Sequence, residues 1–522
     1  MFWADRTAAE IAEKFGTKGP LLVRDEKTVS GRVHIGSMRG VAVHGIVSDA
    51  LLERGITNEF LYEFNDFDVM DDVPGYLPRE KFKPYLGMLL KDVPSPEPSA
   101  PNFAEYFSRE FQGVIEGAGW RPTFYRASEL YLSGKMDGVI REALLGADAI
   151  RRIYKEVSGS HKEEEWLPVA VVCPQCRKIA TTDASDFDNE TVAVHCRPDK
   201  VEYTKGCDFK GRVSPFGGNA KLPWKVEWAA KWKVKGVQVE GAGKDHSTKG
   251  GSRDVANHIS REVFNYESPF DVPYEFILVG GKKMSSSKGR GSSAKEISDL
   301  LPTKMFRLTL LHKDIGQQFN FDPEGDTIPV LYDLYDKLAE GYWAGAKDDY
   351  ARLFFFAHAD GAVPERMFLM RFSQVAFIAQ MPHLSFEQES ERQKGEALTP
   401  PEKAELAERT AYARKWLAEH APEKYVFKLQ DEFPETAQGL SAIQKKAIGV
   451  LGEFFEANPS PSGDEVHHRL HAIKDELDIA PGELFSAIYL LFLAKSSGPK
   501  AGWFLSVLPR EFVLRRLKEA TA

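Results

Sequence analysis

The stretch from residue 20 to residue 64 has the pattern of a strand, a helix and a second strand. Residues 20–23, "PLLV", are an apolar run, and residues 58–64, "NEFLYEF", have the composition of a second strand. Between them, residues 36–55 carry apolar side chains at helical spacing: Val43, Ile46, Val47, Ala50 and Leu51. A helix that connects two strands of one sheet makes them parallel, so we expect a parallel sheet with its ligand at the carboxyl ends of the strands.

The rest of the chain divides by composition. Four prolines in "VPSPEPSAP" mark a loop, and residues 92–222 are predicted to be a helical insertion within the first domain, 1–300. The strand pattern resumes near residue 224 and ends with "YEFILVGG". Beyond residue 300 the periodicity is helical. The predicted fold class is α/β with a parallel-sheet catalytic domain, followed by an all-α C-terminal region.

Length and charge limit the class of protein. A chain of 522 residues is too long for one hydrophobic core, so two to four domains are expected. A net charge of −9 argues against a protein that coats nucleic acid through bulk charge, although cations cluster in "WKVEWAAKWKVKG" and "KKMSSSKGRG". The sequence contains neither an apolar run long enough for a bilayer nor a signal peptide at its start, so we expect a cytoplasmic protein.

All four cysteines fall between residues 173 and 207. In a reducing cytoplasm such clustering indicates a metal site rather than disulfides. Cys173 and Cys176 have zinc-knuckle spacing, and Cys196 and Cys207 would complete a structural four-thiolate Zn²⁺ site. Unmetallated thiols are the alternative, and His195 could replace one ligand.

Two glycine-rich segments follow predicted strands. In "TVSGRVHIGSMRG", residues 28–40, Gly31 and Gly36 allow close approach of the backbone to a nucleotide, and His34 can donate a hydrogen bond to a phosphate oxygen. "VGGKKMSSSKGRGSS", residues 279–293, offers cations and hydroxyls to phosphates. Alternatively, the first is a loop with a solvated histidine and the second a flexible linker.

Together these segments resemble the paired signatures of the class I aminoacyl-tRNA synthetases: His-Ile-Gly-Ser at 34–37 and Lys-Met-Ser-Ser-Ser at 283–287. The resemblance implies a Rossmann-type catalytic domain, a zinc-containing insertion, ATP as substrate and Mg²⁺. It also implies His34 and Lys283 as catalytic residues. The ATP-binding residues that it implies are Ser30, Gly31, His34, Gly36, Ser37, Lys283, Met284, Ser285 and Ser286.

Three stretches are similar to the lysyl branch of this family: residues 23–40, residues 65–78 and the closing "GPKAGWFLSVLPREFVLRRL". Residues 222–254, with Gly-Lys-Asp-His at 243–246, resemble a segment shared by the glutamyl and lysyl branches. The resemblance implies the amino-acid-binding residues Thr28, Asp66, Trp224, His246 and Tyr274, with Asp68 and Glu26 as further acidic candidates. The three aromatic residues could instead be core residues, and the carboxylates solvated charges or helix caps.

Two departures from the family pattern affect the first signature. Arg24 lies where glutamyl enzymes keep an arginine for the substrate carboxylate, so a glutamyl-tRNA synthetase remains an alternative. Val29 replaces the usual proline before Ser30. In the second signature, Ser286 stands where a second lysine is common, so Lys282 and Lys288 are candidates to supply the missing charge.

For the C-terminal region, the resemblance implies a stem-contacting helical segment, 301–345, and a helical anticodon-binding domain, 346–522. The expected activity is ATP-dependent ligation of lysine to tRNA(Lys) by a monomeric enzyme with no membrane partner. A small-substrate nucleotidyl transferase and a non-charging RNA-binding paralogue are the other hypotheses. The first would be expected to lack the long helical C-terminal region, and both signatures speak against the second.

Overall fold

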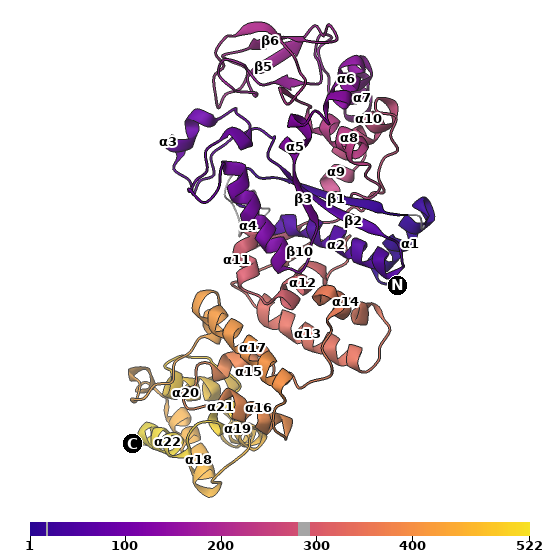
Figure 1. Cartoon of the computed structure of the whole chain (residues 1–522). Helices are drawn as coiled ribbons and strands as arrows, with labels where there is room; N and C mark the ends of the chain where they lie inside the picture. Colours follow the sequence, from indigo (N-terminus) through magenta and orange to yellow (C-terminus); the bar gives the residue numbers. More distant parts are fainter. Residues whose placement is uncertain (17–18, 280–292) are drawn as a thin grey trace. The chain divides into compact units, whose positions relative to one another are not determined.

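The computed structural model describes residues 1–16, 19–279 and 293–522 (Figure 1). The chain forms two compact units, and each is described by itself below. Unit 1 comprises Met1–Phe321 and Leu338–Val363, and unit 2 comprises Asp322–Lys337 and Pro364–Ala522.

The central sheet of unit 1 is parallel, as the strand–helix–strand pattern predicts. Its strands, in the order β1-β2-β3, are Leu21–Thr28, Asn58–Asn65 and Thr123–Arg126. Helix α2 (Met38–Glu53) packs on β1 and β2, and α1 (Trp3–Phe15) packs on α2. Parallel bridges from Val23 to Val239 and from Val239 to Phe270 continue the pairing beyond β1. Unit 1 is therefore a mixed α/β structure.

Strand β3 lies within residues 92–222, the range expected to be a helical insertion, so this range returns to the central sheet. Before β3 comes α4 (Phe103–Gly117), which starts where the Asn102 side chain accepts a 2.8 Å hydrogen bond from the Glu105 N–H. After β3 come helices and short antiparallel strands. They are α5 (Ala127–Leu132), α6 (Asp137–Leu145), α7 (Ala147–Ser158), β4 (Ala170–Val171), β5 (Thr182–Ser185), β6 (Val192–Cys196), β7 (Lys210–Val213) and β8 (Ala220–Lys221).

The remaining elements of unit 1 follow β8. They are α8 (Trp224–Lys235), α9 (Lys244–Ser247), α10 (Ser252–Glu262), β9 (Ile277–Val279), α11 (Ala294–Asp299), α12 (Thr303–Leu311), β10 (Phe319–Phe321) and α14 (Asp349–Ala357). Strands β9 and β10 are parallel, and α13 (Thr327–Trp343) contributes residues to both units. Short helical turns include α3 (Arg79–Phe82) and η1 (Ile35–Ser37).

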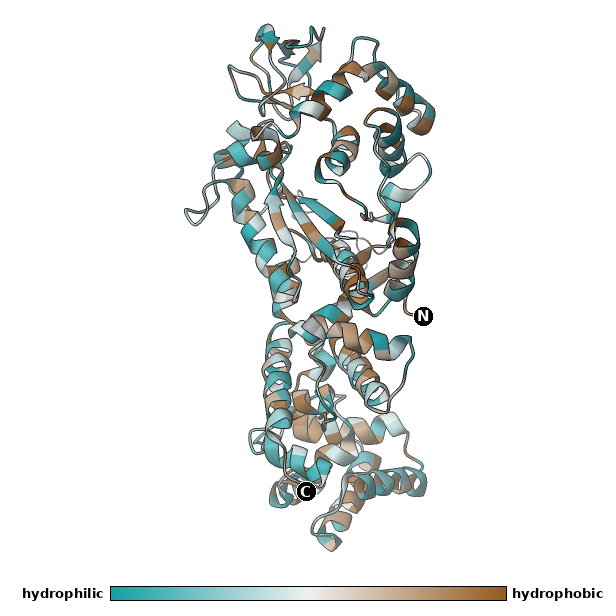
Figure 2. Cartoon of the chain, turned by 45° about the vertical axis from the view of Figure 1, so that its right-hand side comes forward, coloured by the Kyte–Doolittle hydropathy of each residue, from teal (hydrophilic) through white to brown (hydrophobic). Residues whose placement is uncertain are grey.

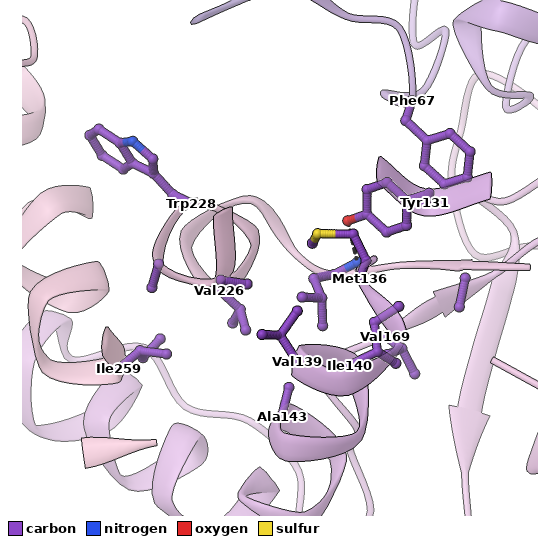
Figure 3. Packing of buried hydrophobic residues seen from close by; sticks show 14 of the residues in the cluster. Phe67, Tyr131, Met136, Val139, Ile140, Ala143, Val169, Val226, Trp228 and Ile259 are labelled. Carbon is purple, nitrogen blue, oxygen red and sulfur yellow. Dashed lines mark hydrogen bonds between the residues drawn. The ribbon is translucent and has the colours of Figure 1, made fainter. Parts of the chain in front are cut away.

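A buried cluster joins α5–α8 and α10 to the end of β2. Phe67 stacks on Tyr131 with ring centroids 4.2 Å apart, and Met136, Val139 and Ile140 continue the packing (Figure 3). Trp228 belongs to the same cluster. Because cores of this kind are close-packed, helix α8 is fixed relative to the sheet.

The secondary-structure elements that lie wholly in unit 2 are all helices. They are α15 (Phe372–Ile378), α16 (Phe386–Lys394), α17 (Pro400–Glu419), α18 (Ala442–Ala457), α19 (Gly463–Leu477), α20 (Pro481–Leu493), α21 (Ala501–Ser506) and α22 (Arg510–Thr521), with short 3-10 turns between some of them. Capping boxes start three of them, at Thr399 with Glu402, at Ser441 with Gln444 and at Ser462 with Glu465.

Hydrophobic and hydrophilic residues alternate along the helices, as Figure 2 shows. None of the described helices combines the length and the apolar character that crossing a membrane requires.

Candidate active site

The first predicted signature lies at the carboxyl end of β1. Strand β1 ends at Thr28, and η1 begins after His34. His34 forms an isolated bridge with Ser293, and the Ala294 N–H donates a 2.8 Å hydrogen bond to the Val33 carbonyl. Strand β9, which ends at Val279, also contacts η1. The described residues on both sides of segment 280–292 therefore lie next to the first signature.

Lys283, Met284, Ser285 and Ser286 themselves lie outside the described residues, as do Lys282 and Lys288.

Beside η1 is a cavity of about 370 Å³. It is lined by Asp25, Glu26, Lys27, Thr28, His34, Gly36, Ser37, Trp224, Trp228, Glu240, Gly241, Ala242, Gly243, His246, Tyr274, Phe276 and Ile277. Three of the predicted ATP-binding residues and four of the five predicted amino-acid-binding residues are in this set. Ser30 and Gly31 precede η1 and do not line the cavity.

Aromatic side chains form one wall of the cavity. Trp224 stacks on Trp228 with centroids 5.4 Å apart, and the His246 ring meets Trp224 edge-on at 5.1 Å. Trp224, Trp228 and Trp232 follow one another along α8, as their spacing predicts, and Trp224 is 39% exposed. Tyr274 is held opposite Gly243 by a parallel bridge. Such a wall can pack against the alkyl chain of a ligand and interact with a cation through the ring faces.

Asp66 does not line the cavity. Its carboxylate accepts hydrogen bonds from the backbone N–H of Ser128 at 2.8 Å and from the Ser128 hydroxyl at 2.5 Å. Burial raises the pKa of Asp66, and the bonds from Ser128 oppose that shift. The Asp66 carboxylate therefore lies at the start of α5, and among the described residues it forms no hydrogen bond or ion pair with another candidate.

His34 is half-buried at the cavity. Burial, with a smaller effect from the cation of Lys27, lowers the pKa of His34 to about 3. The imidazole is therefore neutral at physiological pH, and it can donate one hydrogen bond without adding charge.

Arg24 is fully buried behind the cavity. Its Nε donates to the Tyr125 hydroxyl at 2.9 Å and its Nη1 to Glu240 Oε1 at 2.7 Å. Its Nη2 bonds Glu63 at 2.9 Å and also Glu26. Four of the five guanidinium donors are thus used by the protein itself.

Lys231 on α8 joins the same network. Its Nζ is 2.5 Å from Glu63 Oε1 and 3.4 Å from Glu227 Oε1. Burial opposes the charge on Lys231, but its carboxylate neighbours raise its pKa above the usual value. The pKa of Glu63 falls to about 2 despite its burial, because Lys231 and Arg24 stabilise the carboxylate. Both groups are therefore ionised inside the protein.

Sequence reasoning did not assign Asp25, Lys27, Trp228 and Glu240 to the site, although all four line the cavity. Trp228 was visible only as part of the helical spacing of tryptophans. Val237 and Val239 alternate with polar residues as in a strand, and Glu240 comes directly after them. This alternation was the signal in the sequence that could have placed Glu240 at the end of a strand-like segment.

The four cysteines come together as predicted. Each Sγ lies within 4.8 Å of the others, with Cys173 and Cys207 3.5 Å apart and Cys176 and Cys196 3.6 Å apart. These separations are compatible with four thiolates around one tetrahedral ion. His195 instead contacts Asp208 through Nε2 at 2.7 Å and is not part of the group.

Comparison with known proteins identifies the family of the chain. Residues 1–357 match the family model described as "tRNA synthetases class I (K)". A "Lysine--tRNA ligase" from Methanosarcina barkeri (strain Fusaro / DSM 804) is 33% identical over 99% of this chain and 97% of its own length. A "Lysine--tRNA ligase" from Archaeoglobus fulgidus is 30% identical, with both chains covered completely.

The parallel sheet, the family match and the full-length relatives define a tRNA synthetase, and thus a ligase. Within that class the chain belongs to the class I (K) family.

Proposed function

We propose that this chain ligates L-lysine to tRNA(Lys) through lysyl-adenylate. The observation that carries the proposal is the single cavity in which Thr28, Trp224, His246 and Tyr274 lie beside His34, Gly36 and Ser37. The family match and the names of the relatives support lysine as the amino acid.

The reaction has two displacements. The lysine carboxylate attacks the α-phosphorus of ATP and pyrophosphate leaves; a hydroxyl of the terminal adenosine of tRNA then attacks the acyl carbon and AMP leaves. Neither step needs a covalent enzyme intermediate, so positioning and charge stabilisation carry the catalysis. His34, Ser30, Gly31, Gly36 and Ser37 hold the nucleotide, and Lys283, with Met284, Ser285 and Ser286, stabilises the departing pyrophosphate.

Mg²⁺, when bound to the phosphates, neutralises their charge. The four cysteines bind a structural Zn²⁺, in an insertion of a Rossmann-type domain. Because their thiolates satisfy the ion, it has no position for a reacting water.

Glutamate is the second candidate substrate, and Arg24 decides against it. An arginine that binds a substrate carboxylate needs free donors directed at the ligand. Here Arg24 is 0% exposed and is bonded to Glu240, Glu63 and Glu26.

For the C-terminal region we propose that 346–522 binds the anticodon and that 301–345 contacts the tRNA stem. A groove of about 1030 Å³ supports the first role. Its lining includes Trp503, Phe485, Arg371, Arg392 and Lys500, and aromatic and cationic side chains of this kind bind unpaired RNA bases and phosphates. We place the enzyme in the cytoplasm as a monomer.

Aminoacylation of total tRNA with each amino acid in turn tests the proposal. We expect charging with lysine alone, and ATP–pyrophosphate exchange only when tRNA is present. Charging with glutamate would show the glutamyl activity, and no ATP-dependent charging at all would indicate an RNA-binding paralogue.

A further inference from the structure

The ionic network behind the cavity has an excess of negative charge. Within the described residues it contains the cations Arg24, Lys221 and Lys231, and the carboxylates Glu26, Glu63, Asp68, Glu227 and Glu240, linked by ion pairs of 4.0 Å or less. Each carboxylate has a cationic partner, but three cations against five carboxylates leave the network with two negative charges in excess. Negative charge that is buried and incompletely compensated is costly, so a ligand cation beside the network would be bound favourably.

Two carboxylates of the network line the cavity, Glu26 and Glu240. The Glu240 side chain is 2% exposed and that of Glu26 is 17% exposed. Asp68 is 31% exposed but does not line the cavity. Glu26 is therefore the carboxylate of the network that is most accessible to a ligand in the cavity.

Glu26 also has fewer hydrogen-bond partners within the protein than Glu240 has. Both oxygens of Glu240 are used: Oε1 accepts from Arg24 and from Trp228 Nε1 at 2.9 Å, and Oε2 accepts from Trp232 Nε1 at 2.7 Å. Glu26 uses only Oε2, which contacts Arg24 and lies 3.6 Å from Lys231. Among the residues that the structure describes, none donates a hydrogen bond to Glu26 Oε1.

The register of the sheet explains how Glu26 is held. Glu26 on β1 lies directly beside Glu63 on β2, with their side chains on the same face. Two adjacent carboxylates repel each other, and the Arg24 guanidinium, two residues earlier on that face, bonds both. Burial raises the pKa of Glu26 while Arg24 and Lys231 lower it, so the carboxylate lacks part of the stabilisation that a further cation would supply.

Asp25, the other carboxylate of strand β1 at the cavity, has neighbours of its own. It points to the opposite face of the strand, where its Oδ1 accepts the Glu26 N–H at 2.9 Å. Its Oδ2 lies 3.7 Å from His44 Nδ1, and its charge raises the pKa of Lys27, which burial lowers. Burial raises the pKa of Asp25 as well, but both of its oxygens have a neighbour, whereas Glu26 Oε1 accepts no hydrogen bond from the described residues.

We propose that Glu26 is the specificity-determining residue that binds the ε-ammonium of lysine, and that Arg24 is a positioning residue that holds it. The inference rests on the proposed lysine activity. In a carboxylate-selective pocket an arginine at this position would bind the substrate itself. Here Arg24 instead supports a cation-selective pocket, because Glu26, Glu63 and Glu240 make the net charge around it negative.

The test compares lysine with norleucine, which has the same chain without the ε-ammonium. In tRNA charging with the full-length enzyme, we expect Glu26→Gln to raise the KM for lysine tenfold or more with kcat within threefold. The inhibition constant of norleucine should change by less than twofold. Glu26→Asp retains the charge and should recover most of the preference for lysine over norleucine.

Equal losses for lysine and norleucine, or no change in either, would overturn the role of Glu26. If Glu26→Gln is too unstable for kinetics, the rise in Tm on adding lysine or norleucine to the wild-type enzyme and to Glu26→Gln gives the same comparison, with Glu26→Asp as the variant that retains the charge. The two proposals fail separately. A wild-type enzyme that charges lysine, with a Glu26→Gln variant that keeps its KM, contradicts only the inference. A wild-type enzyme that charges no lysine contradicts the proposed function.

Discussion

Gly40 on α2 lies against Tyr274: a Cβ placed on Gly40 would be 2.7 Å from the Tyr274 hydroxyl oxygen. It would also be 2.8 Å from Asp25 Oδ2. Helix α2 therefore approaches the cavity wall so closely that a Cβ at this position would force Tyr274 and Asp25 to move.

Gly40→Ala is expected to displace Tyr274 and Asp25, since overpacking of a tight site costs about 1–3 kcal/mol. We expect the KM for lysine to rise at least fivefold and the Tm to fall. Gly113→Ala in α4 is the matched control, because a Cβ there meets nothing within 4 Å. Steady-state charging and thermal unfolding of both variants check the prediction, which an unaltered KM in Gly40→Ala would refute.

His34 predicts a pH dependence of stability. Its pKa in the folded protein is about 3, against 6.5 for the unfolded chain, so between these values the unfolded state binds the extra proton. The free energy of unfolding should therefore fall as the pH is lowered from 6.5 toward 3, and this contribution is absent in His34→Asn. Urea unfolding of both proteins between pH 7.5 and 4.5 measures it; a difference between them that does not vary with pH would show that His34 titrates normally.

How much of this site could be foreseen depends on the range of the interactions. The β1–α2–β2 unit and the cysteine cluster follow from local periodicity and spacing. The Arg24–Glu240 and Glu63–Lys231 contacts join residues 216 and 168 positions apart, and nothing local in the sequence pairs them. Strand β3 has four residues and no alternation long enough to detect. The family resemblance implies Asp66 as an amino-acid-binding residue, but its partner Ser128 is 62 positions away and only the folded chain brings the two together.

Lys283 should matter for chemistry more than for RNA binding. If it stabilises the charge that develops as pyrophosphate leaves, Lys283→Ala lowers the single-turnover rate of adenylation by about 10²–10³-fold, as loss of one such electrostatic contact does elsewhere. The Kd for tRNA should change by less than threefold. Lys295→Ala, which removes a surface lysine paired with Asp299, is the control. A larger effect on tRNA affinity than on adenylation would assign the loop to RNA binding instead.

The cysteine cluster should bind one zinc ion and support stability without affecting the amino-acid site, because none of the four cysteines lines the cavity. Cys176→Ser is expected to reduce the zinc content and the Tm while the KM for lysine stays within twofold. Elemental analysis of protein purified without added zinc, combined with thermal unfolding, provides the measurement. Wild-type protein free of zinc, with an unchanged Tm after chelator treatment, would mean that the thiols are unmetallated.

Lys231 and Lys233 lie two residues apart on α8 and differ in how deeply their ion pairs are buried. Lys231 is fully buried between Glu63 and Glu227, whereas Lys233 forms a half-exposed pair with Glu142 at 2.8 Å. Lys231→Met leaves buried carboxylates without a cation and should cost about 3–5 kcal/mol of unfolding free energy. Lys233→Met should cost about 1 kcal/mol or less, since exposed pairs contribute little. Chemical denaturation of the two variants gives the comparison, and similar losses would mean that the network is not the structural support of the cavity. Because Glu26 belongs to that network, Lys231→Met should also weaken lysine binding, whereas Lys233→Met should leave it unchanged.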